Sequence, residues 1–153
     1  MRAISRVLAI LAVAAVAPAA APNFSGHWKL NAEKSKLDDP YVGMTEERTV
    51  DHQDPNLEVS IKAVIDGDNE ESTAKYTTDG KETRNLVDGD PMFSTVRWSG
   101  NALLFESQII SDTDTTELHD RWSLSEDGKT LTIERKQKVG FDVREFVFVY
   151  DRA

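Results

Sequence analysis

Turn-forming residues recur along this chain at short intervals and limit the length of any element between them. The clusters combine Asp, Asn, Ser, Pro or Gly, residues that adopt the backbone geometry of tight hairpin turns. Eight such clusters lie at 54–56, 66–69, 78–80, 88–91, 99–101, 111–114, 126–128 and 140. The segments between them have the length of β-strands and show no sustained helical period. Only Ala32 to Leu37 looks locally helical.

Apolar and polar residues alternate within these segments, which is the period of a strand with one buried face. In 57–65, every second residue from Leu57 is apolar. Leu118, Trp122 and Leu124 share one predicted face of their segment, and polar residues occupy the other. Residues 146–150 are apolar on both faces. These patterns predict an all-β chain.

About ten strands are expected, at 26–31, 45–53, 57–65, 71–78, 82–87, 92–98, 101–110, 115–124, 129–138 and 141–151. Sequential strands joined by short turns form an antiparallel up-and-down meander. A meander of this length must protect its two edge strands, and closing into a barrel does so most completely. We therefore favour a roughly ten-stranded barrel over a two-sheet sandwich, which needs longer connections.

The first residues are predicted to be a secretory signal peptide. Arg2 and Arg6 precede an apolar run from Val7 to Val16, which is shorter than the roughly 20 residues of a spanning helix. The small residues that follow include an A-x-A match ending at Ala19. We expect cleavage after Ala19, which divides the chain into a signal peptide (1–19) and a single barrel domain (20–153). The protein is then exported, either periplasmic or secreted, with no membrane insertion after cleavage.

Composition excludes several classes of function. The formal charge of −9 disfavours nucleic acid and anionic lipid surfaces, because binding to phosphates needs an excess of Lys and Arg. The chain contains no Cys, so disulfides, thiolate nucleophiles and thiolate zinc sites are excluded. The sequence has no phosphate-binding glycine loop and no dinucleotide fingerprint, and we expect no cofactor.

Few residues suggest catalytic chemistry. His27, His52 and His119 are not spaced as metal ligands, so no metal site is predicted. Asp120 lies between Leu118 and Trp122 on an inward-facing pattern, where an acid is usually paired with a nearby Arg or Tyr. We favour a non-enzymatic role.

Both ends of the predicted barrel resemble a known superfamily. The segment Asn23-Phe24-Ser25-Gly26-His27-Trp28-Lys29-Leu30 is similar to the first strand of calycins, the lipocalins and fatty-acid-binding proteins. Gly26-x-Trp28 matches the lipocalin G-x-W, and Val149 to Ala153 resembles the closing strand of fatty-acid-binding proteins. The opening is most similar to bacterial exported lipocalin-like proteins.

The resemblance implies a structural lock at one end of the barrel. In calycins the first-strand Trp plugs the closed end, and a basic side chain lies across it in a cation–π contact. Trp28 corresponds to the plug. Arg152 is the first candidate for the cation, and Arg135 is the second.

Two departures from the family bear on the ligand. Fatty-acid-binding proteins carry an Arg-x-Tyr pair on the last strand, whereas this chain keeps Tyr150 and has Phe148 in place of the Arg. They also have a helix-turn-helix lid between the first two strands, and residues 32–44 are too few for two helices. A fatty-acid head-group site of the familiar kind is therefore not expected.

We expect the chain to be a monomer that binds a small, largely apolar molecule inside the barrel. The residues predicted to contact it are Tyr150, Arg144, Phe148, Phe146, Trp122, Asp120, Phe105 and Phe93. One alternative is an interaction module with a filled core, which would show no internal void and an exposed apolar patch. A less favoured alternative is an isomerase or cyclase that uses Asp120 or His119 as acid or base.

Overall fold

A computed structural model describes residues 20–153 of the chain. The predicted signal peptide (1–19) lies outside the described residues. The described residues form ten strands: β1 (Gly26–Leu30), β2 (Thr45–Gln53), β3 (Asn56–Ile65), β4 (Asp68–Thr77), β5 (Thr83–Val87), β6 (Asp90–Ser99), β7 (Ala102–Ile110), β8 (Thr115–Leu124), β9 (Thr130–Val139) and β10 (Asp142–Arg152). No helix within residues 20–153 is long and apolar enough to cross a membrane.

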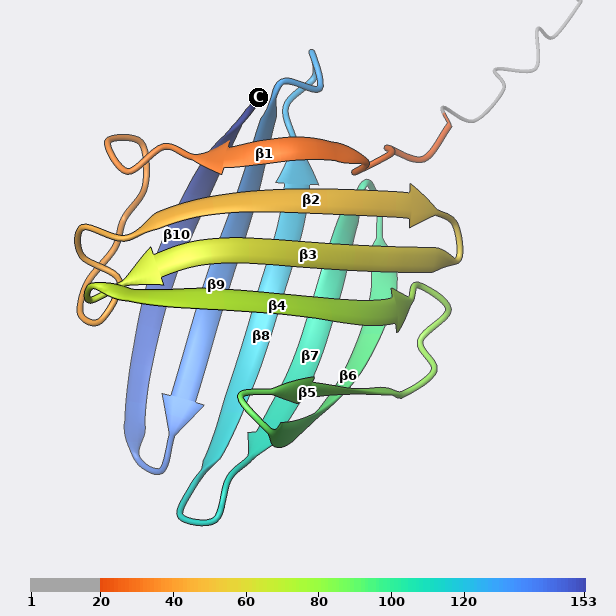
Figure 1. Cartoon of the computed structure of the whole chain (residues 1–153). Coiled ribbons are helices and arrows are strands. Elements are labelled where there is room, and N and C mark those ends of the chain that lie inside the picture. The colour runs from red at the N-terminus through yellow and green to blue at the C-terminus, as the bar shows by residue number, and fades with distance from the viewer. Residues whose placement is uncertain (1–19) are drawn as a thin grey trace, which may run out of the picture.

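All ten strands belong to one antiparallel sheet, which confirms the predicted meander and barrel. The strand order is β4-β3-β2-β1-β10-β9-β8-β7-β6-β5, so the first and last strands of the chain pair with each other. In Figure 1, β1 to β4 cross in front of β7 to β10 at a steep angle. One sheet therefore wraps around a single interior instead of forming a two-sheet sandwich.

The barrel is nearly closed, with its single gap in the sheet between β4 and β5. No backbone ladder joins these strands, but the Asn85 side chain bridges them at one point. Its amide nitrogen donates to the backbone oxygen of Lys75 (3.0 Å), and its amide oxygen accepts from the backbone nitrogen of Lys75 (2.9 Å). The Asn85 side chain thus satisfies the backbone hydrogen-bonding groups of one residue on the edge of the sheet, where backbone groups otherwise have no strand partner.

The strand boundaries agree with the expected ones to within three residues. The largest difference is at β4, which begins at Asp68 because the preceding turn is tighter than expected. Asp66 and Gly67 both have positive φ angles (51° and 86°) and close the hairpin alone. The expected helical stretch at 32–37 was wrong: these residues form a turn, and Lys36 makes a β-bridge to Val147.

One end of the barrel is closed by Trp28, which is fully buried. Its Nε1 donates to the backbone oxygen of Phe24 (3.0 Å). The guanidinium carbon of Arg152 lies 4.2 Å from the centroid of the Trp28 ring. Arg152 also donates to the backbone oxygens of Gly128 (3.0 Å) and Ser25 (2.9 Å), which ties β10 and the residue before β1 to the β8–β9 turn.

Gly26 is required at this closed end for two reasons. Its φ angle of 148° is one that side-chain-bearing residues rarely adopt. A Cβ at this position would also lie 2.2 Å from Nη1 of Arg152. The glycine of the G-x-W motif thus makes room for the guanidinium that covers the tryptophan.

Candidate ligand-binding site in the barrel interior

Four charged residues lie inside the barrel, three of them buried and one partly exposed. Glu46 and Arg48 come from β2, Asp120 comes from β8 and Arg135 comes from β9. The first two and Asp120 are less than a tenth exposed, and the Arg135 side chain is one-fifth exposed. A buried charge is destabilising unless a partner neutralises it, and each of these residues has one.

Glu46 and Arg48 form the first ion pair. Nε of Arg48 donates a hydrogen bond to Oε1 of Glu46 (2.7 Å), and Nη2 of Arg48 lies 2.7 Å from the same oxygen. The hydroxyl of Tyr150 donates to the other oxygen, Oε2 (3.1 Å). Burial opposes the charge on Arg48, but Glu46 and Tyr150 beside it raise its pKa. Burial raises the pKa of Tyr150, so its phenol stays protonated and remains a donor.

Asp120 and Arg135 form the second ion pair, which is bidentate. Nε and Nη2 of Arg135 donate to the two oxygens of Asp120 at 2.8 and 2.7 Å. The two residues face each other across the β8–β9 ladder. Burial opposes the Arg135 charge, but Asp120 raises its pKa, so the guanidinium stays charged. Two parallel hydrogen bonds fix the orientation of both groups.

Aromatic rings surround the two ion pairs. The Arg48 guanidinium lies over the rings of Tyr150 (4.9 Å) and Trp122 (5.2 Å), and that of Arg135 lies over Phe148 (5.4 Å). Trp122 stacks on Phe105, with centroids 4.6 Å apart, and Tyr76 meets Phe105 edge-on. Burial raises the pKa of Tyr76 to about 12. These rings make the wall of the interior mainly apolar while keeping the cations desolvated.

The interior contains space beside these residues. A cavity of about 320 Å³ is lined by apolar residues such as Val59, Ile61, Phe105 and Trp122. A second cavity of about 510 Å³ extends from it toward the β3–β4 turn and the loop between β1 and β2. Arg48 and Arg135 line both cavities, so the two are adjoining parts of one space. Their volumes are in the range of small-molecule sites.

Tyr41 covers part of this interior. It lies in the loop between β1 and β2, meets Phe146 (4.9 Å) and Phe148 (5.5 Å) edge-on, and donates to Gln137 Oε1 (3.3 Å). It lines both cavities. The segment 32–44, which is too short for a helix-turn-helix lid, therefore covers part of the interior with the aromatic side chain of Tyr41.

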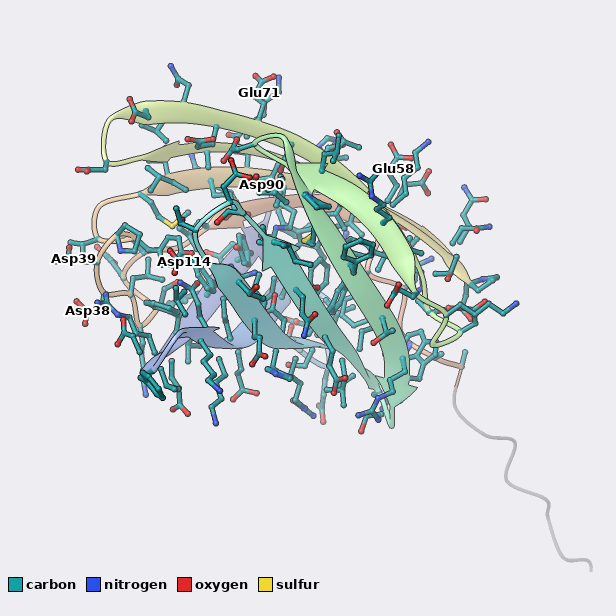
Figure 2. All side chains as sticks on the ribbon, turned by 90° about the horizontal axis from the view of Figure 1, so that it is seen from below. Asp38, Asp39, Glu58, Glu71, Asp90 and Asp114 are labelled. Atoms are coloured by element: carbon teal, nitrogen blue, oxygen red, sulfur yellow. The ribbon has the colours of Figure 1, made fainter. Side chains whose placement is uncertain are left out.

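The open end of the barrel combines apolar and acidic side chains. The exposed large apolar residues of the described chain all lie at this end, in its loops or beside its turns: Val42, Val64, Leu86, Ile110, Phe141 and Val143. The outer cavity is lined by the acids Asp66, Asp68, Glu70, Glu71 and Asp88. Figure 2 shows further acids on this side of the molecule, including Asp38 and Asp39 in the loop and Asp114 in the β7–β8 turn.

Six of the eight residues predicted to contact a ligand lie on the inner face of the barrel. They are Tyr150, Phe148, Phe146, Trp122, Asp120 and Phe105, all of them buried. Tyr150 and Phe148 line the outer cavity, and Trp122, Asp120 and Phe105 line the inner one. Phe146 instead packs against Tyr41.

The inward placement of Phe93 was wrong. The neighbouring residues Met92 and Ser94 are buried on the inner face, so Phe93 points outward and is only half-buried. It pairs in register with Gln108, whose side chain is exposed. A shift of one residue moves a whole strand face to the other side, and the apolar β6 pattern did not determine the face.

Arg144 shares the face of Phe146 but lies outside the cavity, which corrects its predicted role as an internal contact. It is exposed near the start of β10. Its Nε donates to Asp142 (3.0 Å), and its Nη1 donates to the backbone oxygen of Asp39 (2.8 Å). The start of β10 extends past the end of the barrel. The Arg144 side chain therefore lies outside the cavity although it is on the same face of the strand as Phe146.

Neither His52 nor His119 lines the interior cavities. His119 is exposed on the outer face of β8. His52 is buried at the closed end, where Nδ1 accepts from the backbone nitrogen of Phe24 (3.2 Å) and Nε2 lies 3.2 Å from Asp54. Within residues 20–153, no group of three or more His, Asp or Glu side chains is placed to hold a metal ion.

Sequence reasoning missed Glu46 and Arg48, and it considered Arg135 only for the closed end. Strand β2 is polar on both faces, so its alternation does not show which face is buried. The pairing with β3 provides that signal, because Glu46 and Arg48 lie opposite Ala63 and Ile61 on the apolar face. Assigning the inner face of β2 from its antiparallel pairing with β3 would have placed both charged side chains inside the barrel.

No protein-family model matches the sequence. No curated protein matches it. Among solved structures, the chain is similar to a secretory abundant heat soluble protein from Ramazzottius varieornatus (16% identity, TM-score 0.60, 84% of this chain and 94% of that chain). It is also similar to zebrafish ileal bile acid-binding protein complexed with cholic acid (14% identity, TM-score 0.58, 85% of this chain and 98% of that chain). A third similar structure is the Schistosoma mansoni fatty acid binding protein in complex with arachidonic acid (18% identity, TM-score 0.52, 85% of this chain and 96% of that chain). The fold is therefore that of the calycin-like, fatty-acid-binding-protein barrels.

The buried Glu46–Arg48 pair predicts a large penalty when one partner is removed. Glu46→Gln leaves the Arg48 charge without its counter-ion and should lower the free energy of unfolding by about 3 kcal/mol. The double variant Glu46→Leu/Arg48→Met should regain most of this loss. Urea unfolding measures both, with Glu47→Gln on the outer face of the same strand as the control. Equal stability of the two glutamine variants would contradict the burial of an ion pair.

Proposed function

We propose that this chain is an exported, monomeric protein that binds a small, largely apolar molecule inside its barrel. The observation that carries the proposal is the interior space of about 320 and 510 Å³. Its inner part is lined mainly by aromatic and aliphatic side chains with fewer polar groups, which is the usual composition of a small-molecule site, and its outer part also carries acids.

The ligands named for similar structures support this class of ligand. Cholic acid and arachidonic acid are both largely apolar molecules with one polar region. This chain offers a comparable combination, with Val59, Ile61 and Phe105 beside Arg48 and Arg135. The alternative of an interaction module predicted no internal void together with an exposed apolar patch. Exposed apolar residues do lie at the open end, but the cavities argue against a filled interior.

A cavity-filling variant tests the binding of an apolar molecule. Nile red, a neutral dye that brightens in apolar surroundings, should bind the native chain with an increase in fluorescence. Ala74→Phe places a ring in the inner cavity, which Ala74 lines, and should reduce dye affinity at least about tenfold, the equivalent of ~1.4 kcal/mol.

The control is Lys75→Phe, which adds the same ring at the next, exposed position of β4. It should bind the dye as the native chain does. Equal dye binding by both variants would place the dye on the surface and overturn the proposal.

Export is part of the proposal and rests on the sequence of residues 1–19. The basic start, the short apolar run and the A-x-A match at Ala19 support cleavage by a signal peptidase. The opening Asn23-Phe24-Ser25-Gly26 supports the related proposal that the chain belongs with bacterial exported lipocalin-like proteins.

Expression of the full chain in a secreting bacterial host tests export. We expect the protein outside the cytoplasm, with Ala20 as its first residue by N-terminal sequencing. Recovery of the uncleaved chain in the cytoplasm would refute the export proposal and leave the binding proposal intact.

A further inference from the structure

The buried charges of the barrel interior balance each other. Arg48 is neutralised by Glu46, and Arg135 is neutralised by Asp120. A ligand that enters the cavity therefore meets two cations whose counter-ions are already in place. Adding a carboxylate would bring a third negative charge beside Glu46 and Asp120 with no cation left to neutralise it.

Hydrogen-bond donors nevertheless remain in excess. A guanidinium has five N–H groups, and each arginine directs only its Nε and Nη2 atoms at its acid. The hydrogen bonds and ion pairs of Arg48 and Arg135 within residues 20–153 use Nε and Nη2 and leave Nη1 of each free to donate. Both side chains line both cavities. Trp122 also lines the inner cavity, and its buried Nε1 has no partner among the described residues.

The acids at the open end of the barrel also select against anionic ligands. Asp66, Asp68 and Asp88 line the outer cavity together with Glu70 and Glu71. These acids outnumber Arg48 and Arg135, which line the same cavity, and an excess of one sign of charge lowers the local concentration of ions of that sign. An anionic ligand is therefore disfavoured on its way in as well as inside.

We propose that the preferred ligand is an uncharged amphiphile with an oxygen acceptor, such as a ketone, ester or alcohol. Its oxygen accepts hydrogen bonds from the unpaired donors of Arg48 and Arg135, and its apolar body fills the space beside Ile61 and Phe105. A free carboxylate is disfavoured by Glu46 and Asp120, and an ammonium is disfavoured by the two guanidinium groups. This inference rests on the proposed binding function and specifies its ligand.

Competition with Nile red tests the head-group preference. The competitors are tridecan-2-one, dodecan-1-ol, dodecanoic acid and dodecylamine at neutral pH, the first two below their solubility limits and the last two below their critical micelle concentrations. These molecules have apolar chains of similar length and differ in the polar group. We expect the ketone and the alcohol to displace the dye at concentrations at least about tenfold lower than the acid or the amine.

Asp120→Asn tests the charge balance directly. The substitution keeps the shape of the side chain and leaves the Arg135 charge without a counter-ion. The ratio of dodecanoic acid affinity to ketone affinity should rise about tenfold. Glu46→Gln makes the same change at Arg48 and serves if the first variant does not fold. Glu134→Gln is the matched control, since Glu134 faces Arg121 in the neighbouring, outward-facing pair of the same two strands and should leave the ratio unchanged.

The outcomes separate this inference from the binding proposal. Acid binding as tight as ketone binding in the native chain, or no rise in the ratio for Asp120→Asn and Glu46→Gln, would overturn the head-group inference while apolar binding stands. Failure of the native chain to bind Nile red or any competitor would overturn both.

Discussion

Two guanidinium groups, Arg48 and Arg135, lie inside a barrel where an unpaired charge would cost several kcal/mol. Each is held against one carboxylate, Glu46 or Asp120, at hydrogen-bond distance. These pairings orient the aromatic rings beneath them, direct the Tyr150 hydroxyl to Glu46 and leave the remaining N–H groups unpaired. The chemical character of the interior follows from this balance more than from the apolar wall.

The two ends of the barrel have different structural roles. At the closed end, Trp28 and Arg152 lock the first strand to the last, and Gly26 leaves space for the guanidinium. At the open end, a short loop that carries Tyr41 covers only part of the interior. Closure at one end and partial cover at the other leave the ion pairs accessible from the open end. This asymmetry supports a binding role for the interior.

Much of the fold could be predicted from the sequence because turn clusters and alternation are local signals. The strand boundaries and the barrel follow from them, and the alternation in β8 identifies its inner face. The candidate site was less predictable because its charges come from β2 and β9. Strand β2 is polar on both faces, so its inner face is determined by pairing with β3. Phe93 and Arg144 were misplaced for related reasons. The face on which Phe93 lies depends on strand register, and the exposure of Arg144 depends on where the barrel ends.

The central claim is that the interior holds a small molecule, and native mass spectrometry tests it most directly. The chain would be purified without detergent or organic solvent, and its native mass would be compared with its mass after denaturation. The account predicts an excess of a few hundred daltons that is lost on denaturation, from a molecule without a carboxylate. Equal masses, together with no uptake of added tridecan-2-one by the native chain, would contradict it.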